Sequence, residues 1–340
     1  MFGFYLLLMV LFLGGCNRKN TPLGSIPVPK IPQKVDLLPS LVNVKYHEGV
    51  SGVDSCKNCH SEIHREWTQS LHSKSTHSEA FLKQSDNFKF KGCVSCHAPA
   101  EPNFDFNRPK VRDWKVHEGV TCSSCHVLGN RTLGTLGSNA PHKTLKEEKL
   151  RTELACISCH QQTVSQWRES SFKKQNISCQ QCHMPYKHRF ISDFHKLYKK
   201  KDSRSHTFEV NFKECLKLDL KISQLTNQIK FRASNIGAGH SIPTGIYGDA
   251  ALFLEFKIID GDSVVFFREE RLSSQDDTAV PVDGHRTFFY NFRPKGGKKY
   301  ILEGRAIFNS SNYEEDIILD EITKEWLPTG SVRSRKLLLK

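Results

Sequence analysis

One short pattern recurs five times between residues 56 and 183: two cysteines three positions apart, with a histidine directly after the second. With this spacing, a single turn of chain presents both thiols to the two vinyl groups of a porphyrin, and the next imidazole faces the iron. The pattern therefore predicts five covalently bound haem c groups. The attachment cysteines are Cys56, Cys59, Cys93, Cys96, Cys122, Cys125, Cys156, Cys159, Cys179 and Cys182, and the proximal iron ligands are His60, His97, His126, His160 and His183.

A zinc clip is the usual alternative for paired cysteines at this spacing. Zinc has no need of a histidine after every second cysteine, and the chain has only 16 histidines in 340 residues. Five such coincidences argue against zinc, and the same reasoning excludes a thioredoxin-type redox pair.

The N-terminus indicates export, which agrees with thioether formation outside the cytoplasm. Residues 1–15 form an apolar signal peptide about half as long as a membrane span, although no Lys or Arg precedes the apolar run. Leu13-Gly14-Gly15-Cys16 resembles a bacterial lipobox, which predicts lipidation of Cys16; an ordinary cleaved signal is the alternative. The expected location is the cell envelope, as a periplasm-facing or outer-membrane lipoprotein.

The rest of the chain divides by composition into a proline-rich tether (16–45), a haem region (46–205) and a C-terminal region (206–340). In the haem region 33 of 160 residues are Val, Ile, Leu, Met, Phe or Trp, too few for an ordinary core. We therefore expect short helices and coil wrapped around the porphyrins, and no folding without haem.

Within the haem region, the first and fourth motifs begin an internal repeat at an offset of 100 residues. Each motif histidine is followed by Trp and Ser at the same spacing, as Trp67 and Ser70 and as Trp167 and Ser170. We expect a helix in each copy, with Trp against a porphyrin face. The copies differ two residues after the serine, where His72 is replaced by Phe172.

These elements, together with His117-Glu118-Gly119-Val120 before the third motif and Cys182-His183-Met184-Pro185, resemble multihaem cytochromes of the cytochrome c-554/c-prime (c-552/4) type. The resemblance covers roughly residues 52–250. It implies closely packed haems, mostly with two histidine ligands each, that relay electrons. It also marks His72, His117 and the Ser205-His206 element as distal-ligand positions.

In the C-terminal region 43 of 135 residues belong to the same six apolar types, enough for a conventional core. Apolar residues alternate with polar ones at 216–222, 229–233, 252–258, 286–292 and 299–308, between Gly, Asp and Asn turns. This predicts an all-β sandwich of seven or eight strands, immunoglobulin-like in outline. The overall fold class is thus α+β multidomain, a mostly helical and coil pentahaem domain followed by this sandwich.

Two features of the sandwich sequence bear on function. The stretch from Asn235 to Gly245 resembles a GHxxPTG element of the same family, which favours His240 as a haem contact or ligand over a solvent-facing loop histidine. The acidic loop with Asp276, Asp277 and Asp283 could bind calcium, but a solvated loop is favoured.

Distal iron ligands must come from the eleven histidines outside the motifs. We favour His72, His117, His142, His206 and His240; His188 is a close competitor, and His64, His77 and His195 follow. Because Phe172 cannot coordinate iron, we expect His240 to compensate for the break in the repeat.

The formal charge of +13 would suggest nucleic-acid binding, but ten haem propionates nearly cancel it and no recognition motif is present. We expect an electron-carrying lipoprotein that binds its membrane through the lipid anchor and exchanges electrons with other cytochromes or a quinol oxidoreductase. The alternative is an oxidoreductase in which one open haem reduces a small nitrogen or sulfur oxyanion. A polymerising multihaem subunit is a third class.

Overall fold

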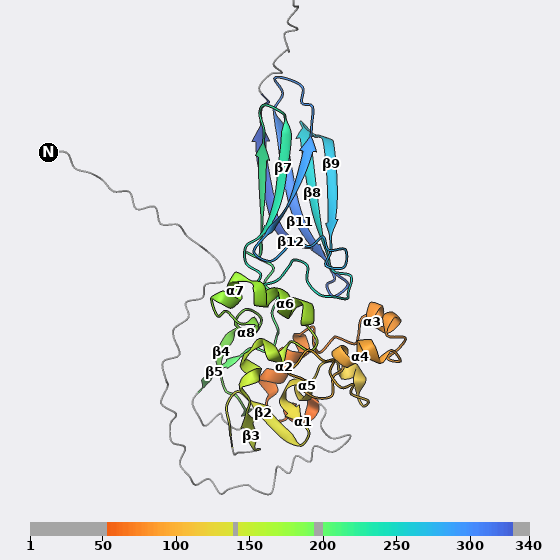
Figure 1. Cartoon of the computed structure of the whole chain (residues 1–340), viewed down its shortest axis with the longest axis vertical. Coiled ribbons are helices and arrows are strands. Elements are labelled where there is room, and N and C mark those ends of the chain that lie inside the picture. Colours follow the sequence, from red (N-terminus) through yellow and green to blue (C-terminus); the bar gives the residue numbers. More distant parts are fainter. Residues whose placement is uncertain (1–52, 139–141, 194–199, 329–340) are drawn as a thin grey trace, which may run out of the picture.

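A computed structural model describes residues 53–138, 142–193 and 200–328, arranged as a helix-rich region at one end and a β-sandwich at the other (Figure 1). The signal peptide, Cys16, the tether and His195 lie outside the described residues. The predicted α+β architecture is confirmed. No helix among the described residues is both long and apolar enough to cross a membrane.

The haem region is built from short elements. Its helices are α1 (Val53–Lys57), α2 (Ser61–Gln69), α3 (Glu79–Gln84), α4 (Lys91–His97), α5 (Cys122–His126), α6 (Gln161–Glu169), α7 (Ser171–Lys174) and α8 (Cys179–His183), with 3-10 turns η1 (Val116–Glu118), η2 (Glu148–Arg151) and η3 (Glu153–Ala155). Two small sheets were not expected: β1 (Val127–Leu128), β2 (Arg131–Gly134) and β3 (Thr144–Lys146) form one, and β4 (Tyr186–Arg189) pairs with β5 (Lys201–Arg204). Their strands are too short to show a period of two.

Few apolar side chains pack together in this region. Among its described residues the buried apolar cluster consists of Phe81, Val94 and Ala98. Buried polar groups support the chain instead; Arg112 is fully buried and donates to the carbonyl oxygens of Pro99, Trp114, Lys115 and Gly119 and to the Thr121 hydroxyl. This pattern agrees with a region whose own side chains do not supply its core.

The repeat seen in the sequence is also a structural repeat. Helices α2 and α6 each begin directly after a motif histidine and end before a serine whose hydroxyl donates to the tryptophan carbonyl at 2.6 Å. Both indoles are buried, and they donate to the carbonyls of Val120 and Ile177. The serine therefore terminates the helix, and the tryptophan ties it to the next segment of chain.

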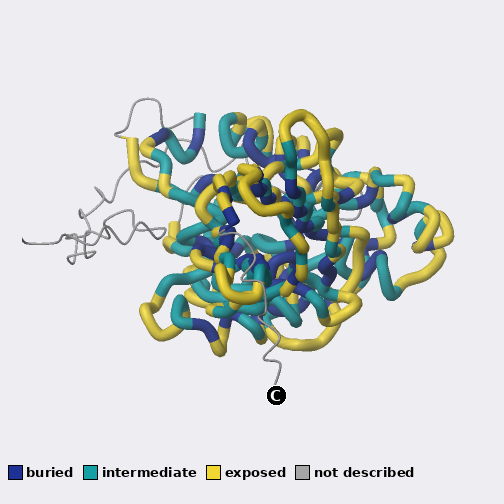
Figure 2. Tube along the Cα trace, turned by 90° about the horizontal axis from the view of Figure 1, so that it is seen from above, coloured by how far each residue is buried: buried dark blue, intermediate teal, exposed yellow. Residues whose placement is uncertain are grey.

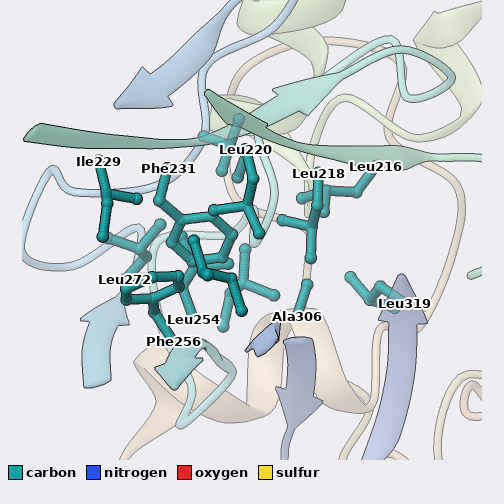
Figure 3. Close-up of a cluster of buried hydrophobic side chains, with 14 of the residues drawn as sticks. Leu216, Leu218, Leu220, Ile229, Phe231, Leu254, Phe256, Leu272, Ala306 and Leu319 are labelled. Carbon is teal, nitrogen blue, oxygen red and sulfur yellow. The ribbon is translucent and has the colours of Figure 1, made fainter. Parts of the chain in front are cut away.

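The sandwich consists of two antiparallel sheets. One has the order β10 (His285–Asn291), β7 (Gln228–Asn235), β6 (Leu216–Ile222); the other has the order β12 (Ile317–Trp326), β11 (Tyr300–Asn309), β8 (Ala251–Asp260), β9 (Ser263–Leu272). Alternate residues of β6 and β7 point inward onto β8, β11 and β12 (Figure 3). Twenty buried residues form this core, among them Phe231, Phe256, Leu254 and Trp326.

The five alternating stretches seen in the sequence correspond to strands β6, β7, β8, β10 and β11. The edge strand β9 showed no alternation because both of its faces are largely exposed. Viewed from above, buried segments lie inside the molecule and exposed ones mainly around its periphery (Figure 2).

Candidate haem-binding site

Each haem motif folds as a tight turn. In the first motif the amide of His60 donates to the Cys56 carbonyl at 2.8 Å, and in the fourth His160 donates to the Cys156 carbonyl at 2.9 Å. The third and fifth motifs are the helices α5 and α8, each opened by a capping box. All ten motif cysteines are partly buried, at the positions where thioether bonds to haem are expected.

Thiols from different motifs touch one another. Cys56 contacts Cys122, Cys96 contacts Cys159, and Cys156 contacts Cys179. Motifs one and three, two and four, and four and five are thus neighbours, although Cys56 and Cys122 lie 66 positions apart in the sequence.

Four motif histidines each face a histidine from elsewhere in the chain. The ring centroids are 6.3 Å apart for His60 and His142, and 6.2 Å apart for His72 with His160, His126 with His206, and His183 with His240. Two metal–nitrogen bonds of about 2 Å plus the two ring radii add up to about 6 Å. The rings are too far apart to stack tightly, and the gap between them fits one metal ion.

Five of these eight imidazoles use Nδ1 for a hydrogen bond to the backbone. Nδ1–H donates to a backbone carbonyl in His60, His126, His183, His206 and His240, at 2.7 to 3.0 Å. A donor at Nδ1 places the lone pair on Nε2, the usual state of an iron-ligating histidine. His77 differs, because its Nε2 donates to the His117 carbonyl, and the exposed His188 pairs with Asp202.

Burial keeps the distal rings neutral. It lowers the pKa of His72 to about 3 and the pKa values of His206 and His240 to about 4. A neutral imidazole keeps the lone pair that metal binding requires. The buried Nδ1 of His72 has no hydrogen-bond partner, so no backbone carbonyl fixes the tautomer of this imidazole.

His97 of the second motif has a different environment. Its Nδ1 donates to the Ser75 carbonyl at 2.5 Å, and Phe81 stacks on its ring at 4.5 Å. Among the described residues no histidine faces it at the spacing of the other four pairs. The predicted ligand His117 is exposed, and its carbonyl accepts from Thr76 and His77, so His97 and His117 are both held against residues 75–77.

His206 is positioned by a buried carboxylate on α2. Glu66 accepts from the His206 amide at 2.9 Å and pairs with Arg189 at 2.6 Å and with Lys187 at 3.1 Å. Burial alone would raise the pKa of Glu66, but these three donors outweigh it and lower the pKa. The ionised carboxylate therefore joins α2 to the β4–β5 hairpin and fixes the histidine that faces His126.

His240 reaches its partner from the sandwich. Gly239, the preceding residue, lies so close to Trp167 and Phe172 that an added Cβ would come within 3.1 Å and 3.3 Å of them. The predicted close approach of this glycine to a flat partner is thus made to the aromatic side chains of the second repeat. Phe172, which stands where the first repeat has His72, packs beside the loop that carries His240.

Five hydrogen bonds hold the sandwich against the second repeat. Gln166 accepts from the Ser241 amide and the Thr244 hydroxyl, both at 3.0 Å, and Thr163 and Thr244 share a 2.9 Å bond. Asp283 accepts from the amide and the hydroxyl of Ser171. Asp283 therefore belongs to this contact, and Asp276 pairs with Arg271 and Ser273. Among the described residues no group of three or more His, Cys, Asp or Glu could hold a separate metal ion.

The chain is similar to known multihaem cytochromes in part of its sequence and in its fold. Residues 55–127, which contain the first three motifs, match the family described as cytochrome c554 and c-prime. The penta-heme cytochrome c552 from Thermochromatium tepidum has a similar structure, with a TM-score of 0.56 at 16% identity over 80% of this chain and 98% of that chain. No curated protein matches the sequence.

Two further solved structures match only a third of the chain, at low TM-scores. A putative beta-galactosidase from Bacteroides fragilis has a TM-score of 0.20 at 15% identity, covering 33% of this chain and 16% of that chain. Chicken MD-1 complexed with lipid IVa has a TM-score of 0.18 at 13% identity, covering 33% and 82%.

The paired histidines, the Nδ1 hydrogen bonds that five of them make to backbone carbonyls, and the partly buried cysteine pairs fit haem c. Fold and site together define a multihaem c-type cytochrome, a protein that transfers electrons. Residues 55–127 are similar to the cytochrome c554 and c-prime family, and the fold of the chain is similar to that of a penta-heme cytochrome c552.

Proposed function

We propose that the chain holds five haem c groups and relays electrons among them in the cell envelope. Bound haem c supplies an iron centre that takes up and releases single electrons. The ten motif cysteines hold the groups, and His60, His97, His126, His160 and His183 are the proximal ligands. His142, His72, His206 and His240 are the distal ligands opposite His60, His160, His126 and His183.

The four histidine pairs are the observation that carries this proposal. Two imidazoles leave no position for a substrate on the iron, so a centre of this kind serves for electron transfer rather than bond chemistry. Backbone carbonyls accept from Nδ1 of His60, His126, His183, His206 and His240, and burial lowers the pKa of the distal candidates His72, His206 and His240. The thiol contacts support a relay in which the second and fifth motifs both adjoin the fourth.

An electron paramagnetic resonance spectrum of the oxidised holoprotein tests the proposal. At least four of five haems are expected to be low-spin, as two strong-field imidazole ligands require. High-spin signals from two or more haems would show that the histidine pairs do not ligate iron, and would overturn the assignment.

The predicted sequence division supports an envelope lipoprotein: a signal peptide (1–15), a tether (16–45) beginning at lipidated Cys16, the haem domain (46–205) and the sandwich (206–340). Other cytochromes or a quinol oxidoreductase are the proposed redox partners. Cys16→Ser should release the protein from membranes, because the remaining signal is too short for a stable anchor. If the variant still fractionates with membranes in high salt, Cys16 is not the anchor.

The environment of His97 favours a second candidate function. If His117 does not reach the second haem, that iron keeps an open position and can reduce a small nitrogen or sulfur oxyanion. Carbon monoxide binding to the reduced wild-type protein distinguishes the two functions. A pure electron carrier binds none, whereas an open second haem binds one equivalent, and His117→Ala then leaves this amount unchanged.

A further inference from the structure

The outer face of the three-stranded sheet carries an unusual set of cations. Strand pairing aligns Lys217, Ser234 and His285 in one row, Asp219, Arg232 and Thr287 in the next, and Lys221, Lys230 and Phe289 in the third. Their neighbours along the strands, such as Leu220, Ile229 and Tyr290, point into the core. The face therefore presents four cations and one carboxylate.

Lys221 and Lys230 lie directly opposite each other, an arrangement that destabilises a sheet. Within the described residues, none of the four cations on this face forms an ion pair. The other sheet differs, because Lys257, Arg271 and Arg305 on its outer face pair with Glu255, Asp276 and Glu321. A like-charge pair without counter-ions on one sheet points to an external anion.

General basicity of the sandwich does not explain this face. Residues 206–328 contain 15 Lys and Arg against 19 Asp and Glu, so the described sandwich is acidic overall. Haem propionates do not explain it either. The contacts to the haem region are made by Ser241, Thr244 and Asp283, near the Asn235 and His285 ends of the strands, whereas the row of Lys221 and Lys230 lies at the opposite ends (Figure 1).

The same far end exposes apolar side chains. Leu225, in the turn between β6 and β7, is 96% exposed, and Phe289, across from Lys230, is 57% exposed. The Lys230 ammonium lies 6.0 Å from the Phe289 ring. Arg293 and Lys295 follow β10 and are also exposed. Of the two acids near the β8–β9 turn, Asp260 forms an ion pair with Lys298, and Asp262 is exposed.

We propose that this far end of the sandwich, formed by Lys221, Leu225, Lys230, Phe289 and Arg293, binds the surface of an anionic phospholipid bilayer. Cations next to exposed leucine and phenylalanine side chains match a surface of lipid phosphates above an apolar layer. The lipid phosphates provide the counter-ions that the opposed lysines lack.

A membrane surface fits this end better than a redox partner does. All ten attachment cysteines lie in the haem region, at the other end of the molecule (Figure 1). A protein docked on Lys221 and Lys230 would be separated from every haem by the length of the sandwich. Binding to a bilayer needs no such proximity and leaves the haem region free for redox partners.

The test uses the holoprotein with Cys16→Ser as background, so that no lipid anchor contributes, and vesicles of phosphatidylcholine with or without phosphatidylglycerol. The background protein is expected to sediment with the anionic vesicles at low salt, and much less at high salt. A triple variant that combines Lys221→Gln, Lys230→Gln and Arg293→Gln should have a partition coefficient lowered about a hundredfold, roughly fivefold for each charge removed. Leu225→Ser should lower it about tenfold.

The matched control replaces Lys257, Arg271 and Arg305 by Gln. It also removes three positive charges, but from the other sheet, and it should change vesicle binding by less than about threefold. The first triple variant should melt no lower than the background, since it removes the like-charge pair, so its loss of binding is not unfolding. Equal loss in both triple variants, unchanged binding in the first, or equal binding to neutral vesicles would overturn the proposal. Cell fractionation tests the Cys16 anchor separately, so either idea can fail alone.

Discussion

Replacing His240 by alanine separates the haem-ligating role of the sandwich from its role in packing. His240 faces His183 at 6.2 Å and is the proposed distal ligand of the fifth-motif haem. In His240→Ala, the fifth-motif haem should lose its distal ligand, and the high-spin fraction should rise by one haem in five over the wild-type value. The reduced variant should bind one more equivalent of carbon monoxide.

The change should stay local, because the other contacts of the loop remain. The five hydrogen bonds that join Ser241, Thr244 and Asp283 to the second repeat are unaffected. At about 1 kcal/mol each, they still contribute about 5 kcal/mol to holding the sandwich against the haem region. The sandwich therefore stays docked, and the other haems keep their spectra.

Electron paramagnetic resonance of the oxidised protein and carbon monoxide titration of the reduced protein measure the effect. His188→Ala is the matched control, since this exposed histidine pairs with Asp202 and should leave every haem unchanged. Added imidazole should return the His240→Ala haem to low spin. If the high-spin fraction does not rise in His240→Ala, the ring opposite His183 is not an iron ligand and the reasoning fails.

Three further predictions concern stability. Without haem, the haem region should be cleaved rapidly in limited proteolysis while the sandwich keeps its β-structure by circular dichroism. The reason is that, among the described residues, the buried apolar cluster has three members in the haem region and twenty in the sandwich. A protease-resistant haem-free haem region would contradict this. Glu66→Ala leaves Arg189 buried without its carboxylate, and should lower the free energy of unfolding of the holoprotein by about 3–5 kcal/mol in denaturant titration. The control Glu169→Ala, at an exposed position, should lower it by less than ~0.5 kcal/mol. Phe231→Ala should lower the free energy of unfolding of the sandwich by about 3–5 kcal/mol, and a calorimetric loss below about 1 kcal/mol would show that this ring is not central to the core.

Local patterns in the sequence were enough to predict the haem motifs, the repeat and most of the sandwich. The cysteine and histidine spacing acts within one turn of chain, so no other part of the fold is needed to recognise it. The strands β6 and β7 alternate because one face of each is buried. Strand β9 could not be found this way, because at the edge of its sheet it is exposed on both faces and has no alternation to detect.

The pairing of histidines was decided by tertiary structure. The sequence offered eleven candidates, and only the folded chain brings His72 to the fourth motif, His206 to the third and His240 to the fifth. His117 was also favoured from the sequence, on a weaker resemblance than His72, yet it is exposed and does not face His97 at the spacing of the other pairs.

The sequence by itself determined which residues can bind haem, because covalent attachment depends on side chains a few residues apart. Only the tertiary structure decided which distant imidazoles meet across an iron-sized gap, because that depends on how Glu66 fixes the segment of His206 and how Gln166 holds the loop of His240. The cation-rich face of the sandwich also depends on tertiary structure. Lys221 and Lys230 become neighbours only when β6 and β7 pair, and no local pattern records that they lie opposite each other.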